Sequence, residues 1–297
     1  MISKTDKISL IIPTYNKASR LRITLHYIKQ IQDRERVNLI IINDGSTDKT
    51  KYVLEEFSRS LSEISFNNIE IIHSSNQGRA TARNIGISKS EDELLLFMDD
   101  DIIPSPGIIS SHFNLYKKNV NSVIHGKIYD LSYLKFFSDP YKGEVSSNIQ
   151  IKELKKMVLP MCDSYDELFM KYLKDNRRTS KMEKKIYSLF FEEKNKGNQW
   201  LSCVGGNLFI NKKQIVECGG FDENFGRLWG CEDLELGYRL YLNGAEFMYN
   251  NAAEVYHMTH YRELAKDEHK TTLDYFLTKH TDTELNILQD YFGDVIK

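Results

Sequence analysis

Short apolar runs recur through the first third of the chain, and each is followed by polar residues. The runs are ISLIIP, NLIIIND, IEIIHSS and ELLLFMDD, all rich in isoleucine and leucine. Each run is continuous rather than alternating, which is typical of strands that are covered on both faces of a parallel sheet. The pattern therefore predicts buried parallel strands in this part of the chain.

Helical patterns separate these runs. In KASRLRITLHYIKQIQ, the residues Leu21, Leu25 and Ile28 recur at four- and three-residue spacing on one face of a helix. The segment STDKTKYVLEEFSRSL opens with good N-cap residues, and NQGRATARNIGISKS predicts a third, shorter helix. Strand and helix alternate at roughly 30-residue spacing, as in βαβ units with right-handed crossovers. The predicted fold class is α/β.

The pattern changes after about residue 130. Residues 131–200 contain few strand patterns and many helix formers, and residues 171–196 carry nine Lys and Arg against four Asp and Glu. Strand-like runs return at WLSCVGGNLFIN and AEFMYNNAAEVYH. The tail after Arg262 predicts one or two amphipathic helices. A helical insertion and a helical tail are therefore expected around the sheet.

The composition is that of an ordinary soluble protein, with 297 residues, 41% hydrophobic, 28% charged and a net charge of −2. The near-neutral balance argues against a nucleic-acid binder. The cysteines are scattered without a CxxC pair, so reduced thiols are expected rather than zinc ligands or disulfides; they are Cys162, Cys203, Cys218 and Cys231. No apolar run resembles a signal peptide or reaches the ~20 residues of a membrane span. A cytoplasmic protein, at most peripheral at a membrane, is predicted.

Candidate ligand-binding residues follow the predicted strands, because ligands of an open parallel sheet bind beyond the carboxyl ends of its strands. After the first three strands come Pro13, Thr14, Tyr15 and Asn16, then Asn43, Asp44, Gly45 and Ser46, then Asn76, Gln77, Gly78 and Arg79. Such a set suits a nucleotide. Neither G-x-G-x-x-G nor G-x-x-x-x-G-K-[ST] follows the first strand, which argues against a dinucleotide dehydrogenase and a P-loop ATPase.

Three consecutive carboxylates, Asp99, Asp100 and Asp101, end the fourth apolar run. Clustered carboxylates become favourable when a divalent cation lies among them. Mg²⁺ and Mn²⁺ commonly bind through one or two carboxylates together with substrate phosphates. A metal-bound nucleotide is the preferred interpretation, and a solvated acidic turn at the end of a strand is the alternative.

Six motifs resemble, in this order, those of the family 2 glycosyltransferases of the GT-A fold. They are LIIPTYNKASRL, NDGSTDKT, NQGRATARNIGI, FMDDDIIP, GGNLFINK and GFDENFGRLWGCEDLELGYRL. The resemblance covers roughly residues 8–260. It implies a Rossmann-like, mostly parallel sheet flanked by helices and a nucleotide-diphosphate sugar as co-substrate. It also implies an enzyme that inverts the anomeric centre, with UDP as the favoured nucleotide.

The resemblance also implies roles for the donor-side residues. Thr14 and Tyr15 would line the base pocket and Asp44 would accept a hydrogen bond from the base. Asp99 would face ribose or metal, while Asp101 would hold the metal. The whole implied nucleotide-binding set is Pro13, Thr14, Tyr15, Asn16, Asp44, Gly78, Arg79, Arg83, Asp99, Asp100 and Gly206. Two alternatives remain at this point: Arg83 as a helix-surface residue and Asp44 as a turn residue.

On the acceptor side, the resemblance implies that Asp233 is the general base and that Glu232 binds a sugar or acceptor hydroxyl. The alternative is a pair of acids that caps a helix N-terminus. Cys231 stands where glycine is frequent in the family, which leaves the local pocket shape open. Trp229 could stack on the acceptor or belong to the core.

A histidine after the last strand completes the metal ligands in related enzymes, so the implied metal set is Asp99, Asp101 and His257. His260 is the alternative to His257, and it could instead lie near the diphosphate or at the surface. A divalent metal, Mn²⁺ or Mg²⁺, is thus an implied cofactor.

The expected organisation is a glycosyltransferase domain at residues 1–260 and a C-terminal helical extension at residues 261–297. Residues 1–103 would form the nucleotide-binding half, and residues 104–260 the acceptor half with its helical segment 131–200. The basic segment could shape the acceptor site, meet an acidic membrane surface or be a solvated helical face. The C-terminal helices could support a homo-oligomer. A sugar nucleotidyltransferase and a non-catalytic carbohydrate- or partner-binding module are the competing interpretations.

Overall fold

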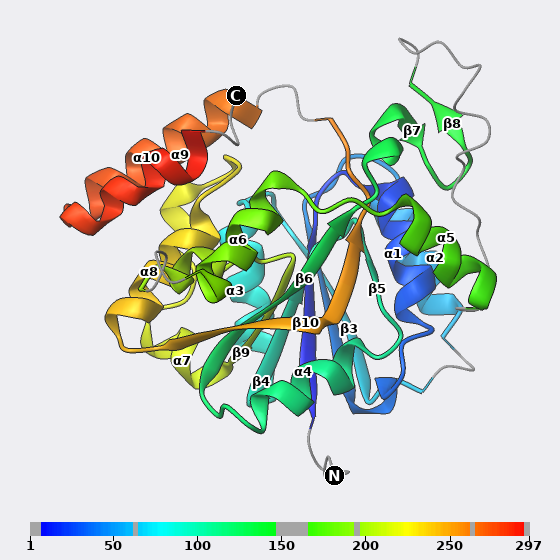
Figure 1. Cartoon of the computed structure of the whole chain (residues 1–297). Helices are drawn as coiled ribbons and strands as arrows, with labels where there is room; N and C mark the ends of the chain where they lie inside the picture. The colour runs from blue at the N-terminus through cyan, green and yellow to red at the C-terminus, as the bar shows by residue number, and fades with distance from the viewer. Residues whose placement is uncertain (1–6, 62–64, 147–165, 193–196, 262–264, 294–297) are drawn as a thin grey trace.

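A central eight-stranded sheet organises the chain (Figure 1). The computed structural model describes residues 7–61, 65–146, 166–192, 197–261 and 265–293. The strand order is β3-β2-β1-β4-β9-β6-β10-β5. The strands are β1 (Ile8–Thr14), β2 (Val37–Asp44), β3 (Asn68–Ser74), β4 (Leu94–Met98), β5 (Ile102–Pro104), β6 (Ser122–Asp130), β9 (Asn207–Asn211) and β10 (Glu246–His257).

The pairing confirms the predicted α/β class. Strands β3, β2, β1 and β4 are parallel neighbours, as the four apolar runs predict. β9 then runs antiparallel to both β4 and β6, and β10 is parallel to β6 but antiparallel to β5. The carboxyl ends of β1, β2, β3 and β4 therefore meet at one edge. β6 and β10 run in the same direction as these four strands, so the carboxyl end of β10 lies at this edge too.

Helices cover both faces of this sheet. The α-helices are α1 (Ala18–Ile28), α2 (Thr50–Arg59), α3 (Arg79–Lys89), α4 (Ile108–Tyr116), α5 (Glu167–Asn176), α6 (Lys181–Phe191), α7 (Lys212–Glu217), α8 (Glu232–Leu242), α9 (Ala265–Lys279) and α10 (Ile287–Gly293). Short 3₁₀ helices lie at Arg34–Arg36, Ser132–Phe136, Gln199–Ser202, Glu223–Phe225 and Thr283–Asn286.

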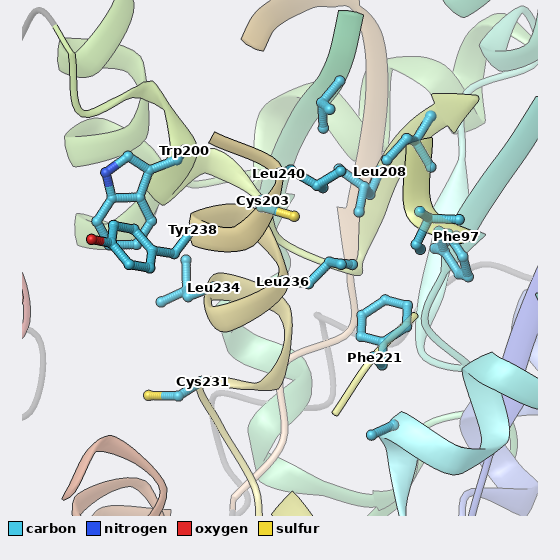
Figure 2. Packing of buried hydrophobic residues seen from close by; sticks show 14 of the residues in the cluster. Phe97, Trp200, Cys203, Leu208, Phe221, Cys231, Leu234, Leu236, Tyr238 and Leu240 are labelled. Carbon is cyan, nitrogen blue, oxygen red and sulfur yellow. The ribbon is translucent and has the colours of Figure 1, made fainter. Parts of the chain in front are cut away.

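The continuous apolar runs are explained by burial on both sides. Along β1, Leu10 and Ile12 pack into a cluster with residues of α1, α2 and α4, whereas Ile11 between them belongs to the cluster on the opposite face. Figure 2 shows part of this second cluster, in which α8 packs toward Trp200 and Phe97. β1 and β4 are buried along their whole length, so both of their faces favour apolar residues, whereas β3 at the edge of the sheet is only half-buried.

The segment after residue 130 is less helical than its composition predicts. It contains a two-stranded sheet, β7 (Phe137–Asp139) and β8 (Glu144–Val145), before α5 and α6. Strands of three and two residues are too short to produce a recognisable period, so the sequence pattern misses them. Residues 147–165 and 193–196 of the expected helical segment lie outside the described residues.

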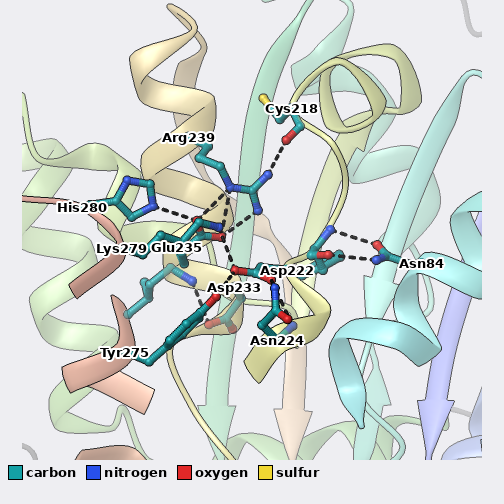
Figure 3. A network of polar contacts seen from close by, with 12 residues as sticks. Asn84, Cys218, Asp222, Asn224, Asp233, Glu235, Arg239, Tyr275, Lys279 and His280 are labelled. Carbon is teal, nitrogen blue, oxygen red and sulfur yellow. Dashed lines mark hydrogen bonds and ion pairs between the residues drawn. The ribbon is translucent and has the colours of Figure 1, made fainter. Parts of the chain in front are cut away.

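The described part of the tail packs on the main body of the chain (Figure 1). Phe276, Leu285 and Phe292 are buried in the same cluster as residues of α8. A polar network also joins α9 to the body, since Lys279 contacts both Asp222 and Glu235 (Figure 3). In the portions that the structure describes, no helix combines the length and apolar character needed to cross a membrane.

Candidate active site

A cavity of about 260 Å³ lies at the carboxyl ends of the parallel strands. Most of the nucleotide-binding residues predicted from the sequence line it, namely Pro13, Thr14, Tyr15, Asp44, Gly78, Arg79, Asp99 and Asp100. Lys17, Asn76, Ala82, Asp101, Arg227, Trp229 and Glu268 complete the lining. The parallel register explains this convergence, because residues that follow neighbouring strands come to one edge.

The carboxylate of Asp44 orders the loop that leads into α3. Its two oxygens accept hydrogen bonds from the backbone amides of Gln77 (2.8 Å) and Gly78 (2.9 Å). Gly78 has a φ of 101°, and a Cβ there would lie 1.7 Å from the carbonyl oxygen of Gly226, so only glycine fits. Asp44 thus combines a place in the cavity wall with a structural role in its loop.

Asn16 lines neither this cavity nor the second one described below. Its side-chain oxygen accepts from the backbone amides of Thr47 (2.7 Å) and Asp48 (3.2 Å). Asn16 therefore ties the loop after β1 to the loop after β2, and it supports the cavity from outside.

Strand pairing brings the histidine at the end of β10 to the aspartate triplet. In the antiparallel pair β10–β5, His257 is opposite Ile102, the residue after Asp101. In the parallel pair β10–β6, His257 is opposite Asp130, and Nδ1 of His257 donates to Oδ1 of Asp130 (2.9 Å). The imidazole Nε2 then lies 3.6 Å from Oδ1 of Asp101.

A candidate metal-ligand group consists of Asp101, His257 and His260. One ligand atom from each residue lies within 4.8 Å of the other two. Nε2 of His260 is 3.1 Å from Oδ2 of Asp101, so both histidines, rather than one, face this carboxylate. A carboxylate with two imidazoles suits Mn²⁺ and other first-row divalent ions better than Mg²⁺, which prefers oxygen. The residues therefore fit a divalent metal. Asp99 is outside this group and faces Arg83 instead.

Lys17 is a member of this cluster that the motif analysis misses. Its Nζ donates to Oδ2 of Asp101 (3.0 Å) and contacts Nε2 of His260. Burial alone would raise the pKa of Asp101, but the charges of Lys17 and His257 hold it well below its usual range. For the neighbouring Asp100, burial raises the pKa to about 6. The two adjacent carboxylates thus differ in pKa, because burial of Asp100 outweighs the charge of Lys17, whereas Asp101 also has the charge of His257 and hydrogen bonds from both histidines.

Arg20 anchors the backbone around the histidines. Its guanidinium donates to the carbonyl oxygens of Met258, Leu134 and Phe137, each at 3.2 Å. Arg20 is buried in α1, so it fixes the segment after β10 against this helix. An arginine suits this role because its planar fork offers several donors at once.

Arg83 joins the two acid clusters. Its Nη1 donates to Oε1 of Glu232 (2.9 Å) and its Nη2 donates to Oδ1 of Asp99 (3.2 Å). The side chain is 1% exposed, which excludes the helix-surface alternative. A buried arginine between two carboxylates is electrostatically compensated, and loss of Arg83 would leave the buried Glu232 with only the more distant Arg79 at 4.0 Å.

Asp233 lies in the first turn of α8. Its Oδ2 accepts from the backbone amide of Gly205 (3.0 Å), and its Oδ1 accepts from that of Leu234 (2.9 Å). Burial, with a contribution from the charge of Glu232, raises the pKa of Asp233 to about 6. Cys231 precedes this pair with a φ of 65°. The left-handed backbone explains why glycine is frequent at this place, and cysteine keeps the same turn at some strain.

A second cavity, of about 470 Å³, opens beside the first. It is lined by Arg83, Gly206, Glu232, Asp233, His257 and His260, together with Met182, Glu183 and Ile186 of α6, His269 of α9 and Phe292 of α10. Arg79, Asp99 and Trp229 line both cavities. The sequence could not predict that α6, α9 and α10 line this cavity. Amphipathic periodicity shows that one side of a helix is buried, but it does not show which part of the protein that side contacts.

Comparison with known protein families decides the class of this site. Residues 9–220 match the family described as glycosyl transferase family 2. The chain belongs to this family. The match confirms the family that the motifs predict. Residues 185–262 of the chain also match the family described as the N-terminal domain of galactosyltransferase.

Relatives of this family 2 chain include longer enzymes. It is 28% identical over 265 residues to the chondroitin synthase of Escherichia coli, covering 85% of this chain and 34% of the relative. It is 27% identical over 262 residues to the uncharacterized glycosyltransferase YfnE of Bacillus subtilis, covering 86% of this chain and 65% of that one. The chain thus spans about a third of one relative and somewhat less than two thirds of the other.

Solved structures share the GT-A fold with this family 2 chain. One is the mannosyltransferase PcManGT of Pyrobaculum calidifontis in complex with GDP-Man and Mn²⁺, with a TM-score of 0.58 and 12% identity. That match covers 93% of this chain and 64% of the mannosyltransferase. Another is S. aureus TarS 1–349 in complex with UDP-GlcNAc, with a TM-score of 0.53 and 16% identity. That match covers 91% of this chain and 66% of the TarS chain.

Proposed function

We propose that this protein is an inverting glycosyltransferase that moves a sugar from a nucleotide-diphosphate sugar to a hydroxyl of a glycan or glycoconjugate. The observation that carries the proposal is that the two cavities share the walls formed by Arg79, Asp99 and Trp229. A nucleotide in the first cavity and an acceptor in the second would then meet at one point. Direct displacement needs this arrangement, because both reactants must be held together.

In this proposal, Asp233 is the general base. Its side chain is half-buried on the wall of the second cavity, and two backbone amides hold its carboxylate in place. A pKa of about 6 leaves the carboxylate ionised at neutral pH while making it a better proton acceptor than an exposed aspartate. It would take the proton of the acceptor hydroxyl as that oxygen attacks the anomeric carbon. Glu232 would bind a hydroxyl of a sugar or acceptor.

The proposed donor is a nucleotide-diphosphate sugar, with UDP as the favoured nucleotide. Tyr15 at the mouth of the first cavity is 44% exposed, which leaves its ring free to stack on a base. Asp101, His257 and His260 would hold a divalent metal, which would neutralise charge on the departing diphosphate. Asp99 would contact ribose or the sugar rather than the metal, because Arg83 already engages it.

The second cavity is the proposed acceptor site. Its charged corner holds Glu232 and Asp233, while Met182, Ile186 and Phe292 give it apolar walls. A glycan fits such a mixture, because a sugar ring has apolar CH faces and a polar rim of hydroxyls. A cytoplasmic location, contact with a membrane surface and self-association through the C-terminal helices stay predictions.

The test is a panel of nucleotide sugars supplied with Mn²⁺ to the wild type and to Asp233→Asn. We expect slow donor hydrolysis and sugar transfer by the wild type with inversion at the anomeric carbon. Asp233→Asn should lose transfer by roughly 10³-fold while nucleotide binding persists. Asp267→Asn is the matched control, because Asp267 is exposed on α9. Undiminished transfer by Asp233→Asn would remove the assigned base, and pyrophosphate release from UTP and a sugar phosphate would favour a nucleotidyltransferase.

A further inference from the structure

The ammonium group of Lys17 lies within the candidate metal-ligand group itself. Nζ is 3.0 Å from Oδ2 of Asp101 and contacts Nε2 of His260, so it touches atoms of two of the three ligand residues. Lys17 is the residue just before α1, and Asp101 and His260 come from distant parts of the chain. The contacts depend on the tertiary structure alone.

These contacts compete with metal binding. A divalent ion needs the lone pairs of the carboxylate oxygen and of the imidazole nitrogen, and the ammonium hydrogens point at the same atoms. Two cations also repel each other at such a distance. Asp101 is only 2% exposed, so it requires a positive partner at all times. Lys17 can meet that need when no metal is bound, but both cations cannot occupy the same oxygen.

The side chain of Lys17 can occupy a second position, inside the first cavity. It lines the first cavity beside Asp99 and Tyr15, where the proposed function puts the nucleotide. The backbone of Lys17 is held, since its amide donates to Oγ1 of Thr50 (3.3 Å). The four-carbon stem can still rotate, and the side chain is 18% exposed. A small rotation about the stem would carry Nζ from the carboxylate into the cavity.

We propose that Lys17 is an exchangeable cation of this site. In the metal-free protein it neutralises Asp101. When a divalent ion binds, the lysine leaves the carboxylate and donates a hydrogen bond to an oxygen of the nucleotide diphosphate. The inference rests on the proposed function, which supplies the metal and the diphosphate. It adds that the protein's own lysine lowers the affinity for the bare metal and couples metal binding to nucleotide binding. Such coupling is reciprocal, so each ligand strengthens the other.

The test measures Mn²⁺ binding by electron paramagnetic resonance of the free ion, without any assay of activity. The proteins are the wild type, Lys17→Met, Lys17→Gln and the control Lys29→Met. Lys29 lies outside both cavities and its Nζ donates to Ser60, so the control removes one charge at a distance. In the absence of nucleotide, we expect Lys17→Met and Lys17→Gln to bind Mn²⁺ at least tenfold more tightly than the wild type, and Lys29→Met to match it.

A second arm titrates Mn²⁺ in the presence of UDP or GDP, whichever gives the larger thermal shift of the wild type. For each protein, the Kd for Mn²⁺ without nucleotide is divided by the Kd with nucleotide. This ratio should be at least tenfold larger for the wild type than for Lys17→Met. Equal or weaker Mn²⁺ binding by both Lys17 variants, in protein that melts as the wild type does, would overturn the exchange. If Mn²⁺ binds no folded protein with or without nucleotide, the metal of the proposed function is wrong instead.

Discussion

The backbone of Gly205 lies against the guanidinium of Arg83, where an added Cβ would be 2.5 Å from Nη2. The amide of the same glycine donates to Oδ2 of Asp233. One loop residue therefore leaves room for the arginine that joins the two acid clusters and also orients the proposed base. Gly205 opens the motif GGNLFINK, and its near neighbour in the structure is the side chain of Arg83.

Replacing Gly205 by alanine should disrupt both relationships. Arg83 is buried and ion-paired on two sides, so it cannot retreat into solvent. We expect a loss of transfer of about 10²-fold, since displacements of about 1 Å near reacting groups have effects of this size. Steady-state kinetics would measure it. Gly107→Ala is the control, because a Cβ there meets nothing nearer than 3.7 Å. Full activity in Gly205→Ala would show that the loop adapts without cost.

The pH dependence of transfer should report the ionisation of Asp233. Burial raises its pKa to about 6, and the base works only when ionised. The value of kcat/KM should therefore be level above pH 7 and fall about tenfold per pH unit below about pH 6. Rates between pH 5 and pH 8, at saturating metal, would measure this. An acid limb near pH 4 would mean that the group controlling the rate is an ordinary exposed carboxylate.

Asp130 should control metal affinity without touching the metal. Its Oδ1 accepts from Nδ1 of His257, which leaves Nε2 of that ring available as a ligand. Asp130→Asn removes the charge behind the imidazole, and losses of this kind weaken metal binding by about 10- to 100-fold. Calorimetric titration with Mn²⁺ would detect the change. Asp139→Asn, an acid outside both cavities, serves as the control, and an unchanged affinity in Asp130→Asn would exclude the role.

The C-terminal helix α9 should detach or loosen in acid. Lys279 lies 2.7 Å from both Asp222 and Glu235 (Figure 3). Burial would raise the pKa of both acids, but hydrogen bonds from Lys279 to Asp222 and from Arg239 to Glu235 lower them. Carboxylates whose pKa is lowered by folding stabilise the fold above their unfolded pKa of about 4, and this stabilisation is lost as the pH falls through the folded value.

Lys279→Met would leave these two acids less compensated, so the free energy of unfolding should fall by about 1–3 kcal/mol at pH 7. The difference from the wild type should shrink as the pH falls toward 3, where the acids become protonated. Thermal melting across this range would measure both effects. Lys270→Met, at an exposed position of the same helix, provides the control. A pH-independent difference would mean that the lysine acts through packing of its stem.

The local sequence was sufficient to predict the parallel strands β1 to β4 and the residues that follow them. Burial on both faces made β1, β2 and β4 continuous apolar runs, and parallel pairing brought the residues after the first four strands to one edge. Thr14, Asp44 and Asp99 could therefore be predicted as neighbours without coordinates. Asn16 shows the limit of this reasoning, because position after a strand does not say whether a side chain faces the cavity or the next loop.

The sequence could not predict which side chains would contact each other when they lie far apart in the chain. Lys17 and His260 are 243 positions apart, and the pairing of β5 with β10 brings the segment of His260 beside Asp101, which Lys17 also contacts. The apolar stripe of α10 predicts a buried face, but not that Phe292 closes a cavity beside Asp233.

The amino-acid order thus determined the class of fold, the family and the two acid clusters, because these depend on local periodicity and on short motifs. The tertiary structure alone decided that Asp101 lies against two histidines and a lysine, while Asp99 pairs with Arg83. The physical reason is that buried charges require partners, and only the packed arrangement of strands and helices determines which charges come within reach of one another.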